Sequence, residues 1–237
     1  MRTNMTIDAE KKFEQELQVF ISEVELASQC FHAWLAIHRT AAKDKRIHRA
    51  MNKRRHFWNT VLYSLQLSYV IVLGRLFGRN THGVDRLLKL AQDSVTVFDR
   101  NALAKRKERM GFRDASTELT KYVSNAYIPE ANDFRQLRKG VDTRRKIYEQ
   151  KFAPLRNKVF AHAEVLGEEA RNELFDKTTV GELRDLLLYL KHLGYSLRDL
   201  FMNGRKPDVE HEFRSGGYSQ IVEQQISEDT EQLLREI

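Results

Sequence analysis

Apolar side chains recur along most of this chain at alternating steps of three and four residues. That spacing places them on one face of an α-helix, so each such stretch predicts a helix with one buried side. Four long stretches show it, near residues 10–35, 55–77, 132–166 and 180–201. The first of them runs through Phe13, Leu17, Phe20, Val24, Ala27, Phe31 and Trp34.

Long helices of similar length bury their apolar faces most simply against one another, as an antiparallel bundle. Strict spacing of this kind would also suit a coiled-coil dimer, but the varied, aromatic-rich stripe residues suit a bundle core better. We therefore predict an all-α protein. Shorter helices are expected at residues 84–91, 101–110 and 117–126.

Proline and glycine residues divide the pattern. Pro154 should kink or restart the third long helix, because proline lacks the N–H group and clashes with the preceding turn. Gly204 and Pro207 mark the end of the fourth helix. These breaks predict one helical-bundle domain over residues 1–207, followed by a separate C-terminal tail over residues 208–237 that is itself weakly amphipathic.

Charge is distributed unevenly between these two parts. The whole chain carries +7, whereas residues 208–237 contain eight acids and two arginines and carry −6, so residues 1–207 carry +13. A body this basic should attract polyanions, nucleic acid first among them. Two basic groups are candidates for an RNA track, although each also fits an ordinary solvated helix face. They are Arg46, Arg49 and Lys53 on one helix face, and the cluster Lys105, Arg106, Lys107 and Arg109.

Several classes of protein are disfavoured by what the sequence lacks. Cys30 is the single cysteine, so no intramolecular disulfide can form and a reducing compartment is expected. The first residues are too polar for a signal peptide, and the most apolar window, 61–74, is shorter than the ~20 residues of a membrane span. Phosphate-loop, dinucleotide-binding and zinc-protease motifs are absent, and the histidine spacing suits no metal pair. We expect a cytoplasmic protein without cofactor, metal or membrane segment.

One segment, Leu155–Glu164 (LRNKVFAHAE), combines residues suited to phosphate chemistry. Arg156 offers a planar, permanently charged fork of donors that can clamp a phosphate. His162 can take and give a proton near neutral pH. Together they could run transesterification of RNA without a metal, with the imidazole deprotonating the 2′-OH and the guanidinium stabilising the phosphorane.

The geometry of a regular helix complicates this reading. At ~100° per residue, Arg156 and His162 point about 120° apart. Either the helix is distorted near Pro154, or the site is composite and uses two copies of the chain across a two-fold axis. A structural interpretation also fits, because His162 falls on an apolar stripe with Leu155 and Val159, and Arg156 could serve to bond helix ends.

The segment also resembles a known family signature. Arg156-Asn157, four residues and then His162 resemble the Arg-polar…His motif of HEPN domains, small helical bundles of prokaryotic toxins and phage-defence proteins. Together with SYVIVLGRLFG (68–78) and GELRDLLLYLKHLGYSLRDLF (181–201), LRNKVFAHAE looks like the abortive-infection branch of that family. The resemblance covers about residues 55–203, which leaves additional helices at both ends.

The resemblance implies a four-helix bundle that dimerises and brings two Arg/His motifs into one cleft. Active members are metal-independent endoribonucleases. Carried over by position, Arg156 would contact the phosphate, His162 would transfer protons and Asn157 would position them. Lys158, next to them in the sequence, is a separate candidate for RNA contact. The prediction is a HEPN-type ribonuclease in a toxin or phage-defence setting, acting as a homodimer and controlled by an antitoxin or other partner.

A second prediction of a different class stays open. Many HEPN-like proteins have lost catalysis, so this chain is alternatively a silent helical module that binds a partner protein or nucleic acid. In that case the acidic tail would serve as a docking or autoinhibitory segment.

Overall fold

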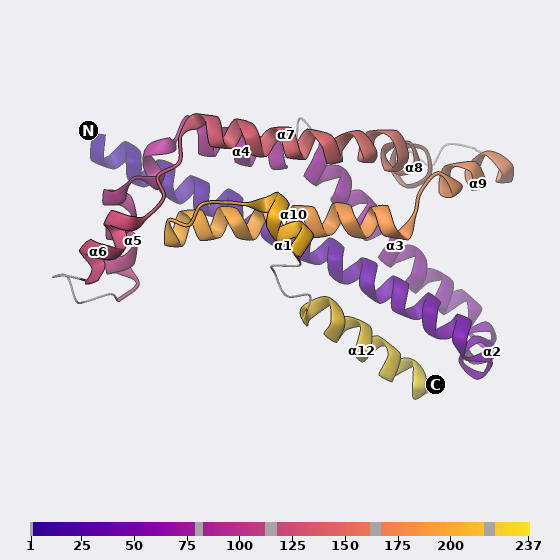
Figure 1. Cartoon of the computed structure of the whole chain (residues 1–237). Coiled ribbons are helices and arrows are strands. Elements are labelled where there is room, and N and C mark those ends of the chain that lie inside the picture. Colours follow the sequence, from indigo (N-terminus) through magenta and orange to yellow (C-terminus); the bar gives the residue numbers. More distant parts are fainter. Residues whose placement is uncertain (1, 79–82, 112–117, 162–166, 216–220) are drawn as a thin grey trace. The chain divides into compact units, whose positions relative to one another are not determined.

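The structure, a computed structural model, describes residues 2–78, 83–111, 118–161, 167–215 and 221–237 (Figure 1). Every regular element within these ranges is helical and none is a strand, which confirms the all-α prediction. The α-helices are α1 (Arg2–Lys43), α2 (Lys45–Lys53), α3 (Arg55–Phe77), α4 (Val84–Asp93), α5 (Arg100–Arg109), α6 (Glu118–Asn125), α7 (Ala131–Ile147), α8 (Ala153–Leu155), α9 (Glu168–Asp176), α10 (Val180–Asn203), α11 (Val209–Ser215) and α12 (Ile221–Arg235). A 3-10 helix, η1 (Val95–Phe98), and two π-helical segments, η2 (Tyr148–Phe152) and η3 (Arg156–Ala161), complete the order.

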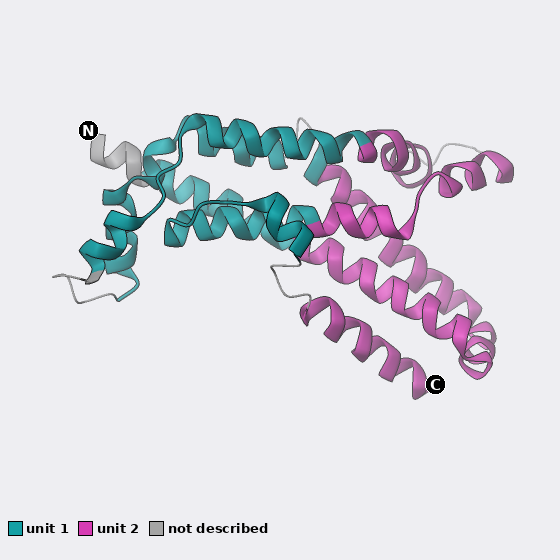
Figure 2. Ribbon diagram, viewed as in Figure 1, with its two compact units in different colours: residues 1–22, 76–146, 189–217 teal, residues 23–75, 147–188, 218–237 magenta. Residues whose placement is uncertain are grey.

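The chain forms two compact units, which Figure 2 colours separately. Unit 1 contains residues 1–22, 76–146 and 189–217, and unit 2 contains residues 23–75, 147–188 and 218–237. Each is described by itself below.

Unit 1 is built around four phenylalanine rings from four different elements. Phe98 of η1 lies 5.0 Å from Phe13 of α1 and 5.3 Å from Phe134 of α7, measured between ring centroids. Phe201 of α10 lies 5.1 Å from Phe13. All four side chains are almost completely buried. Rings at these separations add favourable edge and face contacts to the free energy of burial, so the cluster ties η1 to three long helices.

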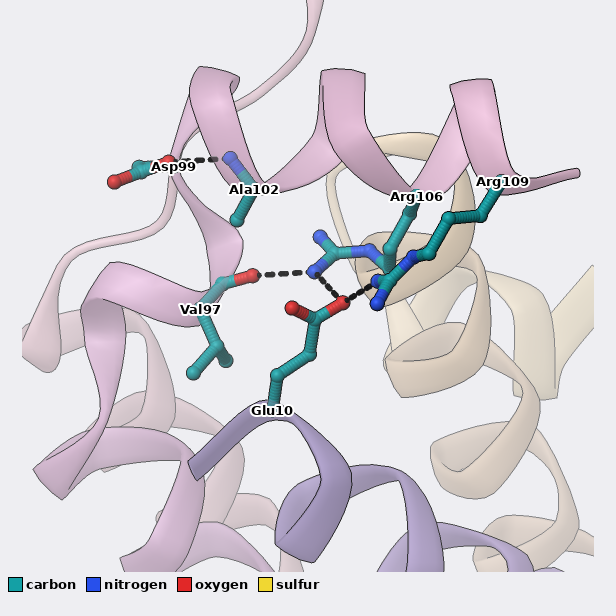
Figure 3. Close-up of polar contacts among 6 residues, drawn as sticks. All are labelled: Glu10, Val97, Asp99, Ala102, Arg106 and Arg109. Atoms are coloured by element: carbon teal, nitrogen blue, oxygen red, sulfur yellow. Dashed lines mark hydrogen bonds and ion pairs between the residues drawn. The ribbon is translucent and has the colours of Figure 1, made fainter. Parts of the chain in front are cut away.

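The basic helix α5 has a different role from the one expected of a charged surface. Asp99 caps its start by accepting a hydrogen bond from the Ala102 amide at 2.7 Å. Arg106 and Lys107 are 4% and 5% exposed, so neither the RNA track nor the solvated face predicted for them is correct. Figure 3 shows Arg106 turned inward toward Glu10 of α1. Of the four basic residues in the predicted cluster, Lys105 and Arg109 are exposed.

α10 ends at Gly204, as the sequence predicts, because the backbone there turns into the left-handed region. The φ of Gly204 is +61°, a conformation that glycine adopts without the steric cost of a side chain. A Cβ atom at this position would also lie 2.6 Å from the Cβ of Ala126. The carbonyl of Gly204 accepts a hydrogen bond from the Tyr127 amide at 2.8 Å, which fixes the end of α10 beside the end of α6.

Unit 2 has an apolar cluster contributed by α1, α2 and α12. Ile37, Ile47, Met51 and Leu234 are the buried members, and side chains of α3 pack against them. Leu234 belongs to the acidic segment that the sequence set apart as a tail, and it is 1% exposed.

α3 is the most apolar helix of this unit. It has 23 residues, longer than the window 61–74, and by length and composition alone it could cross a membrane. Core helices of soluble proteins meet the same criterion, and 39% of its most apolar stretch is buried inside the structure, so one such helix is weak evidence for a span. The absence of a membrane segment stays a prediction.

Candidate functional site

The candidate segment lies where the third long helix changes its hydrogen bonding. After Ile147 the chain passes through the π-helical η2, a short α-helical turn and the π-helical η3, which begins at Arg156. Pro154 sits in the short turn, where its missing N–H prevents a regular bond to the preceding turn. The chain stays helical on both sides of Pro154, and the predicted disturbance takes the form of wider π turns. Such turns are rare and are often found at functional sites.

The Arg156 side chain lies against the backbone of α3 at Gly74. An ideal Cβ atom at Gly74 would be 2.7 Å from Nε and 2.9 Å from Cδ of Arg156, and 3.1 Å from Oη of Tyr148. These distances are shorter than van der Waals contact, so the arginine stem in this position requires a residue without a side chain and would have to move for any other. Two segments that carry the family resemblance, 68–78 and 155–164, therefore meet at this point.

The guanidinium of Arg156 has an incomplete set of partners. Nη1 donates a hydrogen bond to Oδ1 of Asn157 at 2.8 Å. Nε is buried and has no hydrogen-bond partner among the residues that the structure describes, and no acid in those ranges pairs with the guanidinium. A partly buried cation held in place by a neutral amide, with donors to spare, is suited to an anion such as phosphate.

Tyr148 lies beside Arg156 in the same contact with Gly74. Its side chain is 5% exposed, and burial raises the pKa of its hydroxyl, while the Arg156 cation partly offsets that rise. The phenol is therefore a neutral neighbour of the arginine and supplies no counter-charge to the guanidinium.

Glu182, the first acid of the segment 181–201, is already engaged. Lys151 of η2 donates to the carboxylate of Glu182, and this hydrogen bond is the main cause of the lowered pKa of Glu182. Thr179 and Glu182 also form a capping box at the start of α10, with Thr179 Oγ1 2.9 Å from Oε2 and the Glu182 amide 3.1 Å from Oγ1. This acid serves helix capping and the Lys151 contact.

The remaining residues predicted for the site are placed as follows. Asn157 and Lys158 are exposed at the start of η3. The other end of η3 is anchored by Phe160, whose ring centroid lies 5.8 Å from that of Tyr63 and 6.3 Å from that of Phe175. His162 lies outside the described residues. The structure thus brings Arg156 and Asn157 together, and the role of His162 stays a prediction.

The basic residues of α2 form a separate group. Arg46, Arg49 and Lys53 are exposed, on a side of the helix that differs from the buried Ile47 and Met51. Within the described ranges no hydrogen bond joins them to Arg156. Arg46 is partly engaged, since its Nη2 donates to the carbonyl of Arg235 at 3.1 Å.

Sequence reasoning missed Gly74 and the position of Tyr148 beside Arg156. An isolated glycine inside an otherwise apolar helix is a usable signal, because it costs helix stability and so suggests close approach of another group. As for metals, no group of three or more His, Cys, Asp or Glu residues that could hold an ion occurs in the part of the chain described.

Comparison with protein families decides the relationship. A family model described as AbiU2, of the HEPN group, matches residues 11–224. The chain belongs to the HEPN AbiU2 family. This confirms the predicted abortive-infection type of HEPN protein. The match to AbiU2 also takes in most of α1 and the beginning of α12, beyond the 55–203 to which the sequence resemblance was confined. Comparison with curated proteins and with solved structures finds no match.

Proposed function

We propose that this AbiU2 protein is a metal-independent endoribonuclease that acts as a toxin or in phage defence. The observation that carries the proposal is the Arg156 guanidinium, held over Gly74 on a π-helical turn, bonded to Asn157 and without an acidic partner in the described residues. An arginine fixed in this way can meet a phosphate without first breaking an ion pair.

The proposed reaction cleaves the RNA chain by attack of its own 2′-oxygen. His162 takes the proton from the 2′-OH, the 2′-oxygen bonds to phosphorus, and the bond from phosphorus to the 5′-oxygen breaks. Arg156 stabilises the charge on the phosphorane oxygens, and Asn157 keeps the guanidinium oriented. A proton delivered to the 5′-oxygen completes the step, which yields a 2′,3′-cyclic phosphate and a 5′-hydroxyl.

A homodimer suits this reaction because a second copy supplies the second proton-transfer group. With one His162 from each copy, one imidazole can act as base while the other acts as acid. Lys158 and the exposed α2 residues Arg46, Arg49 and Lys53 would hold the flanking phosphates through salt-dependent contacts.

The test is cleavage of end-labelled RNA in EDTA by the wild type, Arg156→Ala and His162→Ala. Arg171→Ala is the matched control, because Arg171 is an exposed arginine of α9 in the same unit. We expect cleavage by the wild type and by Arg171→Ala, with 2′,3′-cyclic phosphate ends, and loss of cleavage in the other two variants.

The alternative, a silent module that binds a partner, makes the opposite prediction. It predicts no cleavage by any of the four proteins across varied RNAs, and a strict monomer at micromolar concentration would support it by removing the composite site. Equal cleavage by all four proteins would identify a contaminant and overturn the ribonuclease proposal.

A further inference from the structure

Two helices of unit 2 with opposite charge pack against each other. α2 carries four basic residues and no acid, a net charge of +4. Residues 221–237, which contain α12, carry five acids and one arginine, a net charge of −4. The two are joined through the apolar cluster in which Leu234 of α12 packs with Ile47 and Met51 of α2. The acidic segment is therefore attached to the most basic helix of its unit.

The end of α12 is held by one of the proposed RNA contacts. Nη2 of Arg46 donates to the carbonyl of Arg235, the last residue of α12, at 3.1 Å. Carbonyl groups in the last turn of a helix lack intrahelical partners and form the negative end of the helix dipole, so a cation is favourable there. Arg46 thus donates to α12 a hydrogen bond that it could otherwise donate to a phosphate.

The start of α12 is held by a buried acid. Glu223 is 6% exposed and lines a small cavity with Ser28, His32 and Arg184. Polar side chains of α1 and α10 therefore surround a carboxylate of the acidic segment. α12 is thus held at its start by a buried acid in a polar cavity and at its end by the hydrogen bond from Arg46.

Between these ends α12 packs poorly. A pocket of about 450 Å³ separates it from α1 and α3, lined by Trp58, Val61 and Leu65 on one side and by Thr230 and Leu234 on the other. Leu233 also lines this pocket but is 59% exposed, whereas the neighbouring Leu234 is almost fully buried. Because the pocket lies under the middle of α12, the helix loses few apolar contacts when it detaches. The free energy of this local opening should therefore be much smaller than that of global unfolding.

We propose that α12 is an internal polyanion that competes with RNA for the basic face of α2 formed by Arg46, Arg49 and Lys53. Binding of RNA across this face requires Arg46 to leave the Arg235 carbonyl, and the negative charge of α12 repels the incoming phosphates. Detachment of α12 frees the whole face. The choice of RNA as the competing polyanion rests on the proposed function.

The test compares two adjacent leucines on the same helix. Leu234→Ser removes the buried anchor of α12, and Leu233→Ser makes the same chemical change at an exposed position. Affinity for a labelled single-stranded RNA is measured against salt concentration in the full chain carrying His162→Ala, so that binding is read without cleavage. Hydrogen exchange of the α12 amides reports detachment.

We expect Leu234→Ser to speed exchange in α12 and to tighten RNA binding by roughly five- to tenfold at 0.1 M salt, the value of about one added phosphate contact. The slope of log affinity against log salt should steepen by about 0.7, the value for one phosphate contact on a single strand. Leu233→Ser should change neither. Adding Arg46→Ala should cancel the gain in the Leu234→Ser protein while changing the wild type little, since Arg46 is already engaged there.

Faster exchange in α12 with unchanged affinity and slope would overturn the proposal, and so would failure of every variant to bind RNA. If Leu234→Ser does not fold, neutralising Glu228, Asp229, Glu231 and Glu236 as amides leaves the apolar anchor intact and should tighten binding in the same direction. Cleavage assays separate the two proposals. Tighter binding without cleavage supports the role of α12 and contradicts the ribonuclease, and cleavage with equal affinities does the reverse.

Discussion

Arg106 of unit 1 is buried and Arg156 of unit 2 is partly buried at Nε, and their partners differ. Arg106 Nη1 lies 3.2 Å from Glu10 and 2.8 Å from the Val97 carbonyl (Figure 3). Its guanidinium carbon lies 4.1 Å from the centre of the Phe201 ring. Arg156 has the amide oxygen of Asn157 and no acid among the described residues. The charge of Arg106 is paired with the carboxylate of Glu10. The charge of Arg156 has no such partner among the described residues, so it can bind an anionic ligand.

A structural arginine is distinguished from a candidate binding arginine by whether the fold supplies its counter-charge. Burial lowers the pKa of Arg106, and the hydrogen bond with Glu10 opposes that shift, so the fold supplies the counter-charge that burial demands. At Arg156 the fold supplies orientation, through Gly74 and Asn157, without a counter-charge. A ligand that brings negative charge would complete the second site and would find no place in the first.

The largest expected effect is therefore loss of stability at Arg106. Arg106→Ala should lower the free energy of unfolding by about 3 kcal/mol, because it leaves Glu10, which is 8% exposed, with a single remaining partner. Urea unfolding followed by circular dichroism measures it. For Arg156→Ala we expect the free energy of unfolding to fall by about 1 kcal/mol or less. An equal loss in both variants would contradict the distinction between the two arginines.

Arg109→Ala is the control at the same carboxylate. Arg109 also pairs with Glu10, but its side chain is 60% exposed, so the solvent can replace most of what it contributes. We expect a loss of about 0.5 kcal/mol. A loss equal to that of Arg106→Ala would mean that the charge on Glu10, and not the burial of Arg106, determines stability.

The next effect should appear in activity with little change in stability. Gly74→Ala places a methyl group 2.7 Å from Nε of Arg156, and the flexible arginine must move aside. A displacement of about 1 Å at a phosphate-binding group can cost on the order of 100-fold in rate, so RNA cleavage should fall steeply. The thermal midpoint should change by only a few degrees.

Gly181→Ala is the matched substitution in the same unit. Gly181 is also helical, and nothing lies within 4 Å of a Cβ atom there. It should leave cleavage unchanged and stabilise the protein slightly, as alanine does in place of a helical glycine. Full activity in Gly74→Ala would contradict the view that α3 positions Arg156.

The two arginines also differ in how well their surroundings could be predicted from the sequence. The buried stripe residues Phe13 and Phe31 were found from spacing alone, because a helix of 3.6 residues per turn must bury a repeated apolar face. Arg106 was misassigned for a reason that spacing cannot reveal. Its partners, Glu10 and Val97, are 96 and 9 residues away, and only the packing of α1 against α5 shows that the arginine is enclosed.

Much the same holds for the candidate site. Arg156 and Asn157 were identified as polar residues in an apolar segment, whereas the contribution of Gly74 depends on the crossing of two distant helices. The π-helical turns beside Pro154 also follow from tertiary packing, since a proline can equally end a helix or bend it.

The smallest expected effect concerns pH and extends the comparison to a third buried polar group. His192 of α10 is 0% exposed, and burial, followed by the charge of Lys191, lowers the pKa of its imidazole below 6.5. The native state therefore binds fewer protons than the unfolded chain as pH falls below about 6.5, and stability is lost in that range. Urea midpoints should decrease from pH 7.5 to pH 5, and His192→Gln should make the decrease smaller. Burial also lowers the pKa of His38, so some decrease of the urea midpoint with falling pH should remain in His192→Gln.

Between pH 7.5 and 9 both imidazoles are neutral in the native and the unfolded state, so the urea midpoints of the wild type and His192→Gln should change in parallel. An unchanged slope below pH 6.5 would mean that His192 accepts a proton inside the folded unit, and the fold would then supply a counter-charge to this side chain as it does to Arg106.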